Sequence, residues 1–566
     1  FIVEALDWLV IGVFFLALIG IIVWVVRQKQ NDSADYFLGG RDATWLAIGA
    51  SIFASNIGSE HLIGLAGAGA SSGMAMAHWE IQGWMILILG WVFVPFYTRS
   101  MVYTMPEFLE RRYNPQSRTI LSVISLVSYV LTKVAVTVYA GGLVFQQVFG
   151  IKELWGIDFF WIAAIGLVVL TALYTIFGGM KSVLYTSVLQ TPILLLGSLI
   201  ILVLGFKELG GWDEMMRVCG AVTVNNYGDT MTNLIRSNDD ANFPWLGALI
   251  GSAIIGFWYW CTDQFIVQRV LSGKNEMEAR RGTIFGAYLK LLPVFLFLIP
   301  GMIAFALHQK YIGAGGEGFL PMLANGTANA DAAFPTLVAK LLPAGVKGLV
   351  VCGILAALMS SLASLFNSSA MLFTIDFYKR FRPETPEKKL VGIGQVATVV
   401  IVILGILWIP IMRSVGDVLY TYLQDVQSVL APGIAAAFLL GICWKRTSAQ
   451  GGMWGLIAGM VIGLTRLGAK VYYSNAGEVA DSTFKYLFYD MNWLFFCGWM
   501  FLFCIIVVIV VSLATKAPTA EKIQGLVFGT ATKEQKAATR ASWNHWDIIH
   551  TVIILAITGA FYWYFW

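Results

Sequence analysis

Long apolar segments recur along this chain, and short polar segments separate them. A membrane-spanning helix needs about 20 mostly apolar residues. Fourteen segments reach or approach that length: 5–26, 43–66, 79–98, 117–147, 157–178, 184–205, 244–268, 282–308, 336–373, 391–412, 416–443, 450–469, 490–513 and 546–566. The pattern predicts an all-α polytopic membrane protein with about 14 transmembrane helices.

The composition agrees with this pattern and excludes several classes of protein. Of the 566 residues, 58% are hydrophobic and 12% are charged, whereas soluble domains carry about 25% charged residues. The polar loops are too short for a soluble catalytic domain, and the sequence has no Walker-type phosphate loop. The six cysteines show no spacing typical of a metal site or a disulfide framework. We therefore expect a protein that works within the bilayer and is not an enzyme.

Lysine and arginine predict the orientation, because loops rich in them lie on the cytoplasmic side. The other set of alternating loops is poorer in these residues, although it includes the two longest, 206–243 and 309–335. Both termini are therefore expected outside, which requires an even number of spans. The rich set contains Arg27, Lys29, Arg41, Arg99, Arg111, Arg112, Arg118, Lys181, Arg269, Lys274, Arg280, Arg281, Lys379, Arg380, Arg382, Lys388, Lys389, Lys445, Arg446, Lys516, Lys522, Lys533, Lys536 and Arg540.

The stretch ASNIGSEHLIG, residues 54–64, interrupts an apolar segment with polar residues. It places Gly58, Glu60 and His61 where a continuous helix would be expected. Non-helical backbone at membrane depth is tolerated only where it is buried in protein or lines a cavity, and broken helices form the binding sites of secondary transporters. The alternative is that Gly58 and Gly64 only allow close helix packing. Because packing does not explain the adjacent Glu60 and His61, we predict a broken helix that forms a binding site.

Isolated charges occur in or beside other apolar segments. Glu80 opens one segment in HWEIQGW, and Lys290 lies inside another in GAYLKLLPVFLFLIPG. A buried lysine is costly and is usually paired or functional. The alternative for Glu80 is a helix cap, but it follows the polar end of the preceding segment, which favours a place in the same site. For Lys133, in LTKVAVTVY, we predict a structural ion pair.

The stretch WYWCTDQFIVQR, residues 258–269, combines three aromatic residues with Asp263 and Gln264. Aromatic rings are suited to stack on sugar faces, while amides and carboxylates bind hydroxyl groups. The alternative is a belt of aromatic residues at the membrane interface. Asp263 is expected to form a structural ion pair with a nearby cation such as Arg269.

The stretch ILAALMSSLASLFNSSA, residues 354–370, places small and hydroxyl-bearing residues along one helical face. One interpretation is a packing face whose hydroxyls bond to carbonyls of their own helix. The other is a cation site, in which hydroxyls and free carbonyls supply oxygen ligands. Spacing alone leaves both open for Ala357, Ser360, Ser361, Ser364 and Ser368.

A last polar stretch, DVLYTYLQDVQSVLAPG at residues 417–433, carries Gln424 in a segment that Pro432 and Gly433 interrupt. Gln424 faces either a solute or a neighbouring helix. The residues themselves do not decide between the two.

These stretches together resemble the sodium:solute symporter family, and its sodium/glucose cotransporter branch in particular. The resemblance implies two inverted repeats of five helices with broken first helices, one helix before them and three after. It covers nearly the whole chain, and its landmarks are specific in combination: DYFLGGR (35–41), GASIFASNIGSEHLIGLAGAGASSG (49–73), TMPEFLERRY (104–113), LYTIFGGMKS (173–182), WYWCTDQFIVQR (258–269), YLKLLP (288–293), LMSSLASLFNSSAMLFTIDFY (358–378) and FLLGICWKR (438–446).

On this resemblance the chain divides into five parts. Repeats with an odd number of helices must have opposite orientations, and the predicted topology agrees. The parts are a leading helix and cytoplasmic loop (1–42), the first inverted repeat (43–205), an extracellular loop (206–243), the second inverted repeat (244–443), and three accessory helices with a cytoplasmic loop (444–566).

The resemblance also implies which residues bind the transported sugar and close over it. Tyr259 would form the inner gate beneath the sugar, with Trp260 packed alongside. The outer hydrophobic gate would consist of Leu65, Trp79 and Tyr420. The sugar hydroxyls would form hydrogen bonds with Asn56, His61, Glu80, Lys290 and Gln424.

For the co-transported sodium ion, the resemblance implies a site between the 54–57 break and the serine face. This implication favours the cation interpretation of that face. The ligands would be the carbonyl oxygens of Ala54, Ile57 and Ala357 and the hydroxyls of Ser360 and Ser361.

The implied function is a symporter that couples inward sodium movement to uptake of a hexose, glucose or galactose, by alternating access. Three departures from the family pattern refine it. Ser187 replaces an aspartate near a second cation site, which favours one sodium per sugar. Gly256 replaces a polar residue, which leaves the sugar preference open. The loop 309–335 lacks cysteine, which favours a bacterial member in the inner membrane.

Other functions remain as alternatives. One alternative is a sodium-coupled symporter of another organic solute such as myo-inositol. A sugar sensor or a channel is an alternative from a different class. An intramembrane hydrolase using Ser360 or Ser361 with His61 is disfavoured, because no nucleophile-elbow motif is present. The expected partners are a small sugar, sodium and the lipid bilayer, with no nucleic acid and no obligate protein partner.

Overall fold

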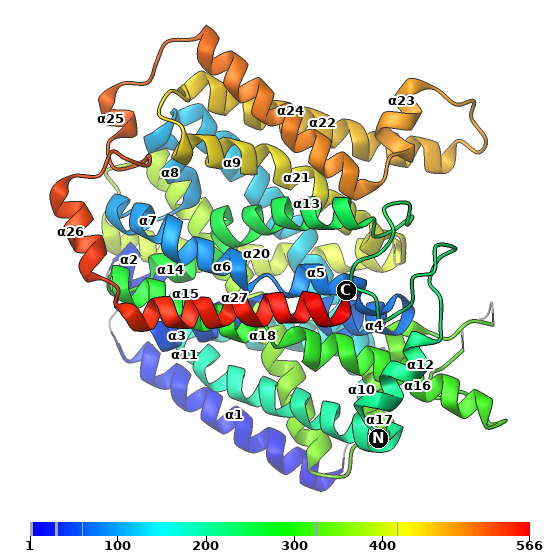
Figure 1. Ribbon diagram of the computed structural model, residues 1–566. Coiled ribbons are helices and arrows are strands. Elements are labelled where there is room, and N and C mark those ends of the chain that lie inside the picture. The colour runs from blue at the N-terminus through cyan, green and yellow to red at the C-terminus, as the bar shows by residue number, and fades with distance from the viewer. Residues whose placement is uncertain (1–3, 29–31, 59, 323–325, 416) are drawn as a thin grey trace.

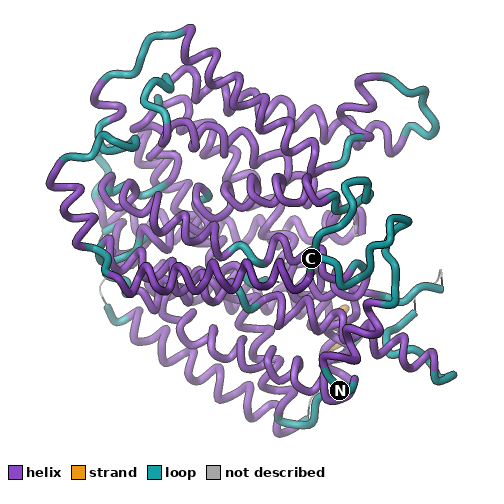
Figure 2. Tube along the Cα trace, viewed as in Figure 1, coloured by secondary structure: helices purple, strands orange, loops and turns teal. Residues whose placement is uncertain are grey.

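The computed structural model describes residues 4–28, 32–58, 60–322, 326–415 and 417–566, and these fold almost entirely into helices (Figures 1 and 2). The two short strands β1 (Glu153–Leu154) and β2 (Ile157–Asp158) form an antiparallel hairpin in a loop. The prediction of an all-α membrane protein is therefore confirmed.

The first half of the chain alternates long helices with short helical segments. Its elements are α1 (Ala5–Val26), α2 (Ser33–Phe37), η1 (Gly39–Arg41), α3 (Trp45–Asn56), η2 (Glu60–Leu65), α4 (Ala66–Ser71), η3 (Gly73–Met76), α5 (Ala77–Glu80), α6 (Gly83–Ile88), η4 (Leu89–Phe93), α7 (Val94–Ser100), α8 (Met105–Arg112), α9 (Pro115–Ser128), η5 (Tyr129–Val134), α10 (Ala135–Phe149), α11 (Phe159–Leu209) and α12 (Trp212–Gly220).

The second half continues in the same manner. Its elements are α13 (Trp245–Gly256), η6 (Phe257–Thr262), α14 (Gln264–Leu271), α15 (Glu276–Lys290), η7 (Val294–Leu298), α16 (Ile299–Gly313), η8 (Ala330–Ala332), α17 (Ala333–Leu341), α18 (Val346–Met371), η9 (Leu372–Tyr378), α19 (Lys379–Phe381), α20 (Glu387–Val415), α21 (Asp417–Cys443), α22 (Ala449–Asn475), α23 (Thr483–Lys485), η10 (Tyr486–Asp490), α24 (Trp493–Ala514), α25 (Ala520–Ile523), α26 (Lys533–Ala541) and α27 (His545–Phe565).

Ten helices within the described ranges are long and apolar enough to cross a membrane. One of them is the 51-residue α11, which covers two predicted spans. Gly179 divides α11, because its φ of 61° is left-handed and glycine adopts that conformation without steric cost. Shorter apolar helices, Trp45–Asn56 and Gln427–Cys443, coincide with two more predicted spans. The total of 14 stays a prediction.

The two ends of the bundle differ in the loops they carry. In Figure 1, α2, α25 and α26, which belong to loops rich in lysine and arginine, lie at the left-hand end, and α12 and α23 lie at the right-hand end. Helix α1 begins and α27 ends on the right. This arrangement fits an even number of crossings, and the side of the membrane stays a prediction.

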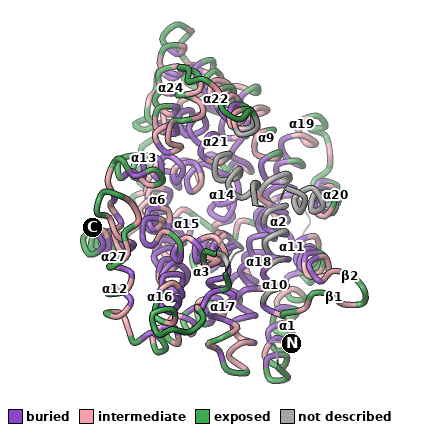
Figure 3. The backbone as a smooth tube through the Cα atoms, turned by 90° about the vertical axis from the view of Figure 1, so that its right-hand side faces the viewer, coloured by how far each residue is buried: buried purple, intermediate pink, exposed green. Residues whose placement is uncertain are grey.

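Among the helices long enough to span a membrane, α18 lies in the most deeply buried segment, and it packs against α11, α3 and α20 at the centre of the bundle (Figure 3). In the most apolar stretch of Val346–Phe381, 89% of residues are buried, compared with 22% in α1. Outer helices such as α1 and α24 expose apolar side chains, as expected where a helix faces lipid. The small and polar residues of α18 are therefore enclosed by protein.

Two helices of the bundle are broken at membrane depth. Helix α3 ends at Asn56, Ile57 is extended with φ −78° and ψ 117°, and η2 begins at Glu60. In the other broken helix, Asp263 is extended with φ −83° and ψ 133° between η6 and α14. The break predicted within residues 54–64 is thus confirmed, and both breaks are buried in protein, where such backbone is tolerated.

Candidate functional site

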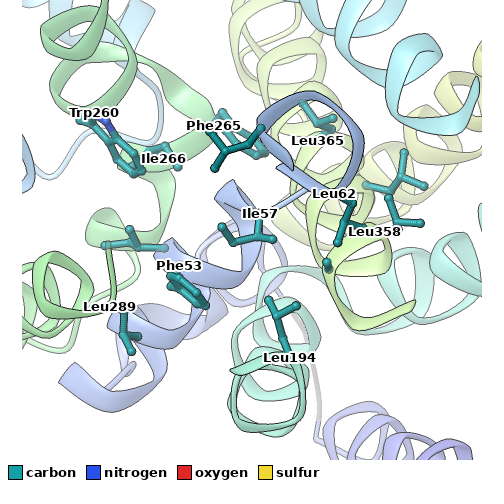
Figure 4. Close-up of a cluster of buried hydrophobic side chains, with 14 of the residues drawn as sticks. Phe53, Ile57, Leu62, Leu194, Trp260, Phe265, Ile266, Leu289, Leu358 and Leu365 are labelled. Atoms are coloured by element: carbon teal, nitrogen blue, oxygen red, sulfur yellow. The ribbon is translucent and has the colours of Figure 1, made fainter. Parts of the chain in front are cut away.

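The two breaks line one cavity of about 160 Å³ inside the bundle. Parts of α5, α15 and α18 complete its wall. Figure 4 shows that the apolar side chains of Ile57 and Leu62 lie on either side of the α3 break, among side chains from other helices. The cavity brings together nine residues that the sequence analysis selected: Asn56, His61, Leu65, Trp79, Glu80, Tyr259, Trp260, Lys290 and Ser361.

A cluster of three ionisable side chains lies in this wall. Lys290 Nζ donates a hydrogen bond of 2.8 Å to Glu80 Oε2, and His61 Nε2 lies 3.3 Å from the same oxygen. All three residues are buried. Burying a charge is costly unless it is paired, and the Glu80–Lys290 pair meets this requirement. The cluster presents both donors and acceptors to the cavity, which is the chemistry that binds hydroxyl groups.

The amide of Asn56 supplies a further polar group at the α3 break. Its Nδ2 is buried and has no hydrogen-bond acceptor in the part of the chain that the structure describes. A buried donor without a partner carries a desolvation cost of about 1–3 kcal/mol. A bound solute with a hydroxyl group would satisfy it.

Aromatic rings form another side of the cavity. The rings of Tyr259 and Trp260 are nearly perpendicular, with centroids 4.9 Å apart. Lys290 Nζ lies 5.3 Å from the Trp260 ring centre, within the range of a cation–π interaction. The aromatic and charged walls therefore meet at Trp260.

The second break has a different set of contacts, and they correct one expectation. Asp263 Oδ2 lies 3.3 Å from Lys133 Nζ, and the Tyr129 hydroxyl donates to Asp263 Oδ1. The structural ion pair predicted for Lys133 is confirmed, but the expected pair between Asp263 and Arg269 is wrong. Arg269 instead lies over the Phe265 ring, at 5.7 Å. Asp263 precedes α14 in an extended conformation, so the break directs its side chain and the helical spacing that places Arg269 does not.

The proposed outer gate is only partly described. Leu65 and Trp79 line the cavity, and the Trp79 ring stacks on Trp493 with centroids 5.6 Å apart. The side chains of Tyr420 and Gln424 lie outside the described residues.

The residues implied as sodium ligands come from α3, its break and α18. All five residues are buried. A Cβ added to Gly58 would lie 3.2 Å from Ser361 Oγ, so this hydroxyl faces the break. The helix ends here, which leaves its last carbonyl oxygens without helical N–H partners. Hydroxyl and carbonyl oxygens are hard ligands that suit a sodium ion. The five residues are Ala54, Ile57, Ala357, Ser360 and Ser361.

Several hydroxyls of the serine face, including that of the implied ligand Ser360, form hydrogen bonds with protein groups. Ser364 Oγ hydrogen-bonds with Ser55 Oγ of α3, and Ser368 Oγ donates to Gln268 Oε1 at 2.9 Å. Ser360 Oγ donates to Gln190 Oε1 of α11. The face therefore joins helices as well as lining the break.

Sequence reasoning missed several residues of this site. Gln190 bonds Ser360, Trp493 stacks on a proposed gate residue, and Gln82 lines the cavity. Gln82 stands two positions after Glu80, and this nearness was a usable signal. No local pattern points to Trp493, because it comes from an accessory helix more than 400 positions after Trp79.

A cavity between two broken membrane helices is typical of a membrane transporter for a small solute. The sequence profile of the sodium:solute symporter family matches residues 36–459. The human sodium/myo-inositol cotransporter 2 is 36% identical over 93% of this chain and 79% of its own length. The sodium/glucose cotransporter 4 of Danio rerio is 36% identical over 92% of this chain and 80% of its own length.

A solved structure of a Na+-coupled sialic acid symporter, bound to substrate and open outward, has the same fold. Its TM-score is 0.73 at 22% identity, over 91% of this chain and 99% of that one. The chain belongs to the sodium:solute symporter family. It is a multi-pass membrane protein that couples sodium to the movement of a small solute, and it is not an enzyme.

Proposed function

We propose that this symporter couples inward sodium movement to the uptake of a hexose, glucose or galactose. The main support for this proposal is that two sets of residues line one cavity. The ionisable cluster consists of Glu80, Lys290 and His61, and the rings of Tyr259 and Trp260 lie beside it. A sugar ring has apolar faces and a rim of hydroxyls that both donate and accept hydrogen bonds. The cavity offers groups complementary to both.

Individual roles follow from the position of each group. Glu80 accepts hydrogen bonds from the sugar and Lys290 donates, while Asn56, His61 and Gln424 bind further hydroxyls. Tyr259 closes the cavity towards the cytoplasm, with Trp260 packed beside it. A site built to bond each hydroxyl rejects analogues that lack one, because a buried polar group is then left unpaired. The outer gate consists of Leu65, Trp79 and Tyr420.

Sodium binds between the α3 break and α18 in this proposal. The carbonyls of Ala54, Ile57 and Ala357 and the hydroxyls of Ser360 and Ser361 are its ligands. The proximity of Ser361 to Gly58 supports this assignment. One sodium moves per sugar in this proposal, because Ser187 stands where the family has an aspartate near a second cation site, and its hydroxyl donates to the Val183 carbonyl of its own helix at 2.7 Å.

The α3 break couples the two ligands, because it holds sodium ligands and the sugar ligand Asn56 within three residues. Sodium joins α3 to α18 and stabilises the outward-open state, after which sugar binds and the outer gate closes. Each ligand raises the affinity for the other by the same factor. A sodium ion that moves inward down the membrane potential releases about 2.3 kcal/mol of free energy per 100 mV.

The proposed setting is the inner membrane of a bacterium, with both termini outside. The inverted repeats span residues 43–205 and 244–443, and their broken first helices are α3 with η2 and α13 with α14. Alternating access then moves these two units around a fixed cavity.

A second candidate solute is myo-inositol. The similarity to sodium/myo-inositol cotransporters favours it as much as the similarity to a sodium/glucose cotransporter favours a hexose. A cyclic polyol presents the same rim of hydroxyls to the cluster. A sugar sensor would bind without flux, and a channel would not accumulate solute.

The deciding experiment is uptake of labelled glucose into proteoliposomes under an inward sodium gradient, with an equal potassium gradient as the control. Galactose and myo-inositol are added in excess as competitors. Sodium-driven accumulation that galactose blocks is the expected result. Accumulation of labelled myo-inositol without that of glucose would replace the hexose by a polyol. If sodium drives the uptake of neither, the proposal is wrong.

A further inference from the structure

Gln82 is a cavity residue to which neither the motifs nor the proposed function gives a role. It lies between α5 and α6, two residues after Glu80, and is 3% exposed. Ile81 and Gln82 have non-helical backbone angles, with ψ of 50° and 25°. The chain therefore bends here, and the bend directs the Gln82 side chain towards α13 and η6.

The side-chain amide of Gln82 is held at both ends. Its Nε2 donates to the Ser252 carbonyl at 2.7 Å, and its Oε1 accepts from Trp260 Nε1 at 3.2 Å. Two hydrogens on Nε2 and two lone pairs on Oε1 leave one donor and one acceptor for another partner. The amide is thus both fixed in position and able to bind a ligand.

Gly256 makes room for this amide. A Cβ built at position 256 would come within 2.9 Å of both Nε2 and Oε1 of Gln82, closer than carbon atoms approach in real structures. The Gln82 amide therefore fills the space that a side chain at position 256 would need. Both residues line the cavity.

We infer that Gln82 is a specificity-determining residue. Its amide occupies the space left by Gly256 and from there forms a hydrogen bond with a hydroxyl of the transported solute. The inference rests on the proposed function, because it takes the solute to be a hydroxylated ring. Gln82 adds an amide to the cluster formed by Glu80, Lys290 and His61. Its bonds to Trp260 and Ser252 fix the direction in which that amide presents its free donor and acceptor.

The test pairs a Gln82→Met variant with monodeoxy analogues of D-glucose and D-galactose, each lacking one hydroxyl. Sodium-driven uptake in proteoliposomes gives kcat/KM for each variant and analogue. For wild type, removal of the hydroxyl that Gln82 binds is expected to lower kcat/KM about fivefold, the effect of one neutral hydrogen bond. For Gln82→Met, removal of that same hydroxyl is expected to have no further effect, while the other deoxy analogues lose activity as in wild type.

A second variant, Gly256→Ser, tests the same effect independently, in case Gln82→Met fails to fold. Its added side chain displaces the amide, so it is expected to abolish the same single-hydroxyl effect while leaving Gln82 in the chain. Gln268→Met is the matched control. Gln268 is a buried glutamine that hydrogen-bonds with Phe37, Asn367 and Ser368 and does not line the cavity, so all hydroxyl effects should persist in this variant.

Three results would count against the inference. If the Gln82→Met substitution lowers kcat/KM by the same factor for every sugar and analogue, Gln82 only positions Trp260. Retention of the single-hydroxyl effect in Gly256→Ser would show that the two positions do not share a function. Each leaves the proposed function intact, because wild type still accumulates hexose. Failure of wild type to accumulate any hexose would overturn both.

Discussion

The two broken helices of this symporter share a backbone irregularity but differ in how their polar groups are satisfied. At the α3 break, Asn56 Nδ2 has no acceptor among the described residues, and the Ser361 hydroxyl faces Gly58. At the α13–α14 break, Asp263 bonds Tyr129 and Lys133, and its carbonyl accepts from the Val267 amide at 3.0 Å.

This difference indicates that the α3 break is a ligand site and that the second break has a structural role. Unmet polar groups are costly in a membrane interior unless a ligand completes them. The α3 break therefore suits ligand binding, and the second break holds its own helices together. Substitutions at the first should change ligand affinity, and those at the second should change stability.

The largest effect is expected at the second break, for Asp263→Asn. Loss of the carboxylate leaves Lys133, whose side chain is 10% exposed, without a counter-charge, and breaking a fully buried pair costs about 3–5 kcal/mol. Thermal unfolding of the purified protein should show a large fall in unfolding temperature. Adding Lys133→Met should restore part of it. An unchanged unfolding temperature combined with weaker sodium binding would make Asp263 a ligand instead.

Next in size is Glu80→Gln in the cavity. It removes a charged acceptor from both Lys290 and the solute, and a hydrogen bond to a charged group contributes about 1.5–3 kcal/mol. We expect kcat/KM for sodium-driven sugar uptake to fall about 100-fold. Glu107→Gln is a matched control in α8, where its carboxylate pairs with Arg111 at 3.3 Å. Equal loss in both variants would contradict a role for Glu80 in the site.

A smaller effect is expected for Ser361→Ala at the first break. Loss of one oxygen ligand should raise the sodium concentration for half-maximal uptake about tenfold, and the sugar KM should rise through the coupling between the two ligands. The readout is uptake against sodium concentration, with ionic strength held constant by choline.

Ser364→Ala is the comparison for that variant. Its hydroxyl bonds Ser55 and the Ser360 carbonyl, so we expect lower thermal stability and an unchanged sodium requirement. If both serine variants shift the sodium requirement equally, the proposed ligand set is wrong.

The smallest effect is expected for Asn56→Ala. Because Nδ2 has no acceptor among the described residues, its loss should leave thermal stability nearly unchanged. The solute KM should rise about fivefold, the effect of one neutral hydrogen bond of about 1 kcal/mol. Uptake kinetics and thermal unfolding of the same preparation measure both. A large loss of stability would show that Asn56 joins helices instead of binding solute.

The sequence by itself determined the class of protein and the place of one break. Apolar segments of membrane-spanning length require helices, because lipid offers no partners for backbone groups. Gly58, Glu60 and His61 mark the place where that helix had to stop. The family followed from motifs spread along the chain, and it implied the roles proposed for Glu80, Lys290 and Ser361.

Only the tertiary structure decided which groups meet. Lys290 bonds Glu80 across 210 positions, and Asp263 bonds Lys133 across 130 positions, not the nearby Arg269. Sequence distance does not predict such pairs, since partners at membrane depth are set by which helix faces pack together. Gln82 became a candidate only because Gly256, on another helix, leaves space for its amide.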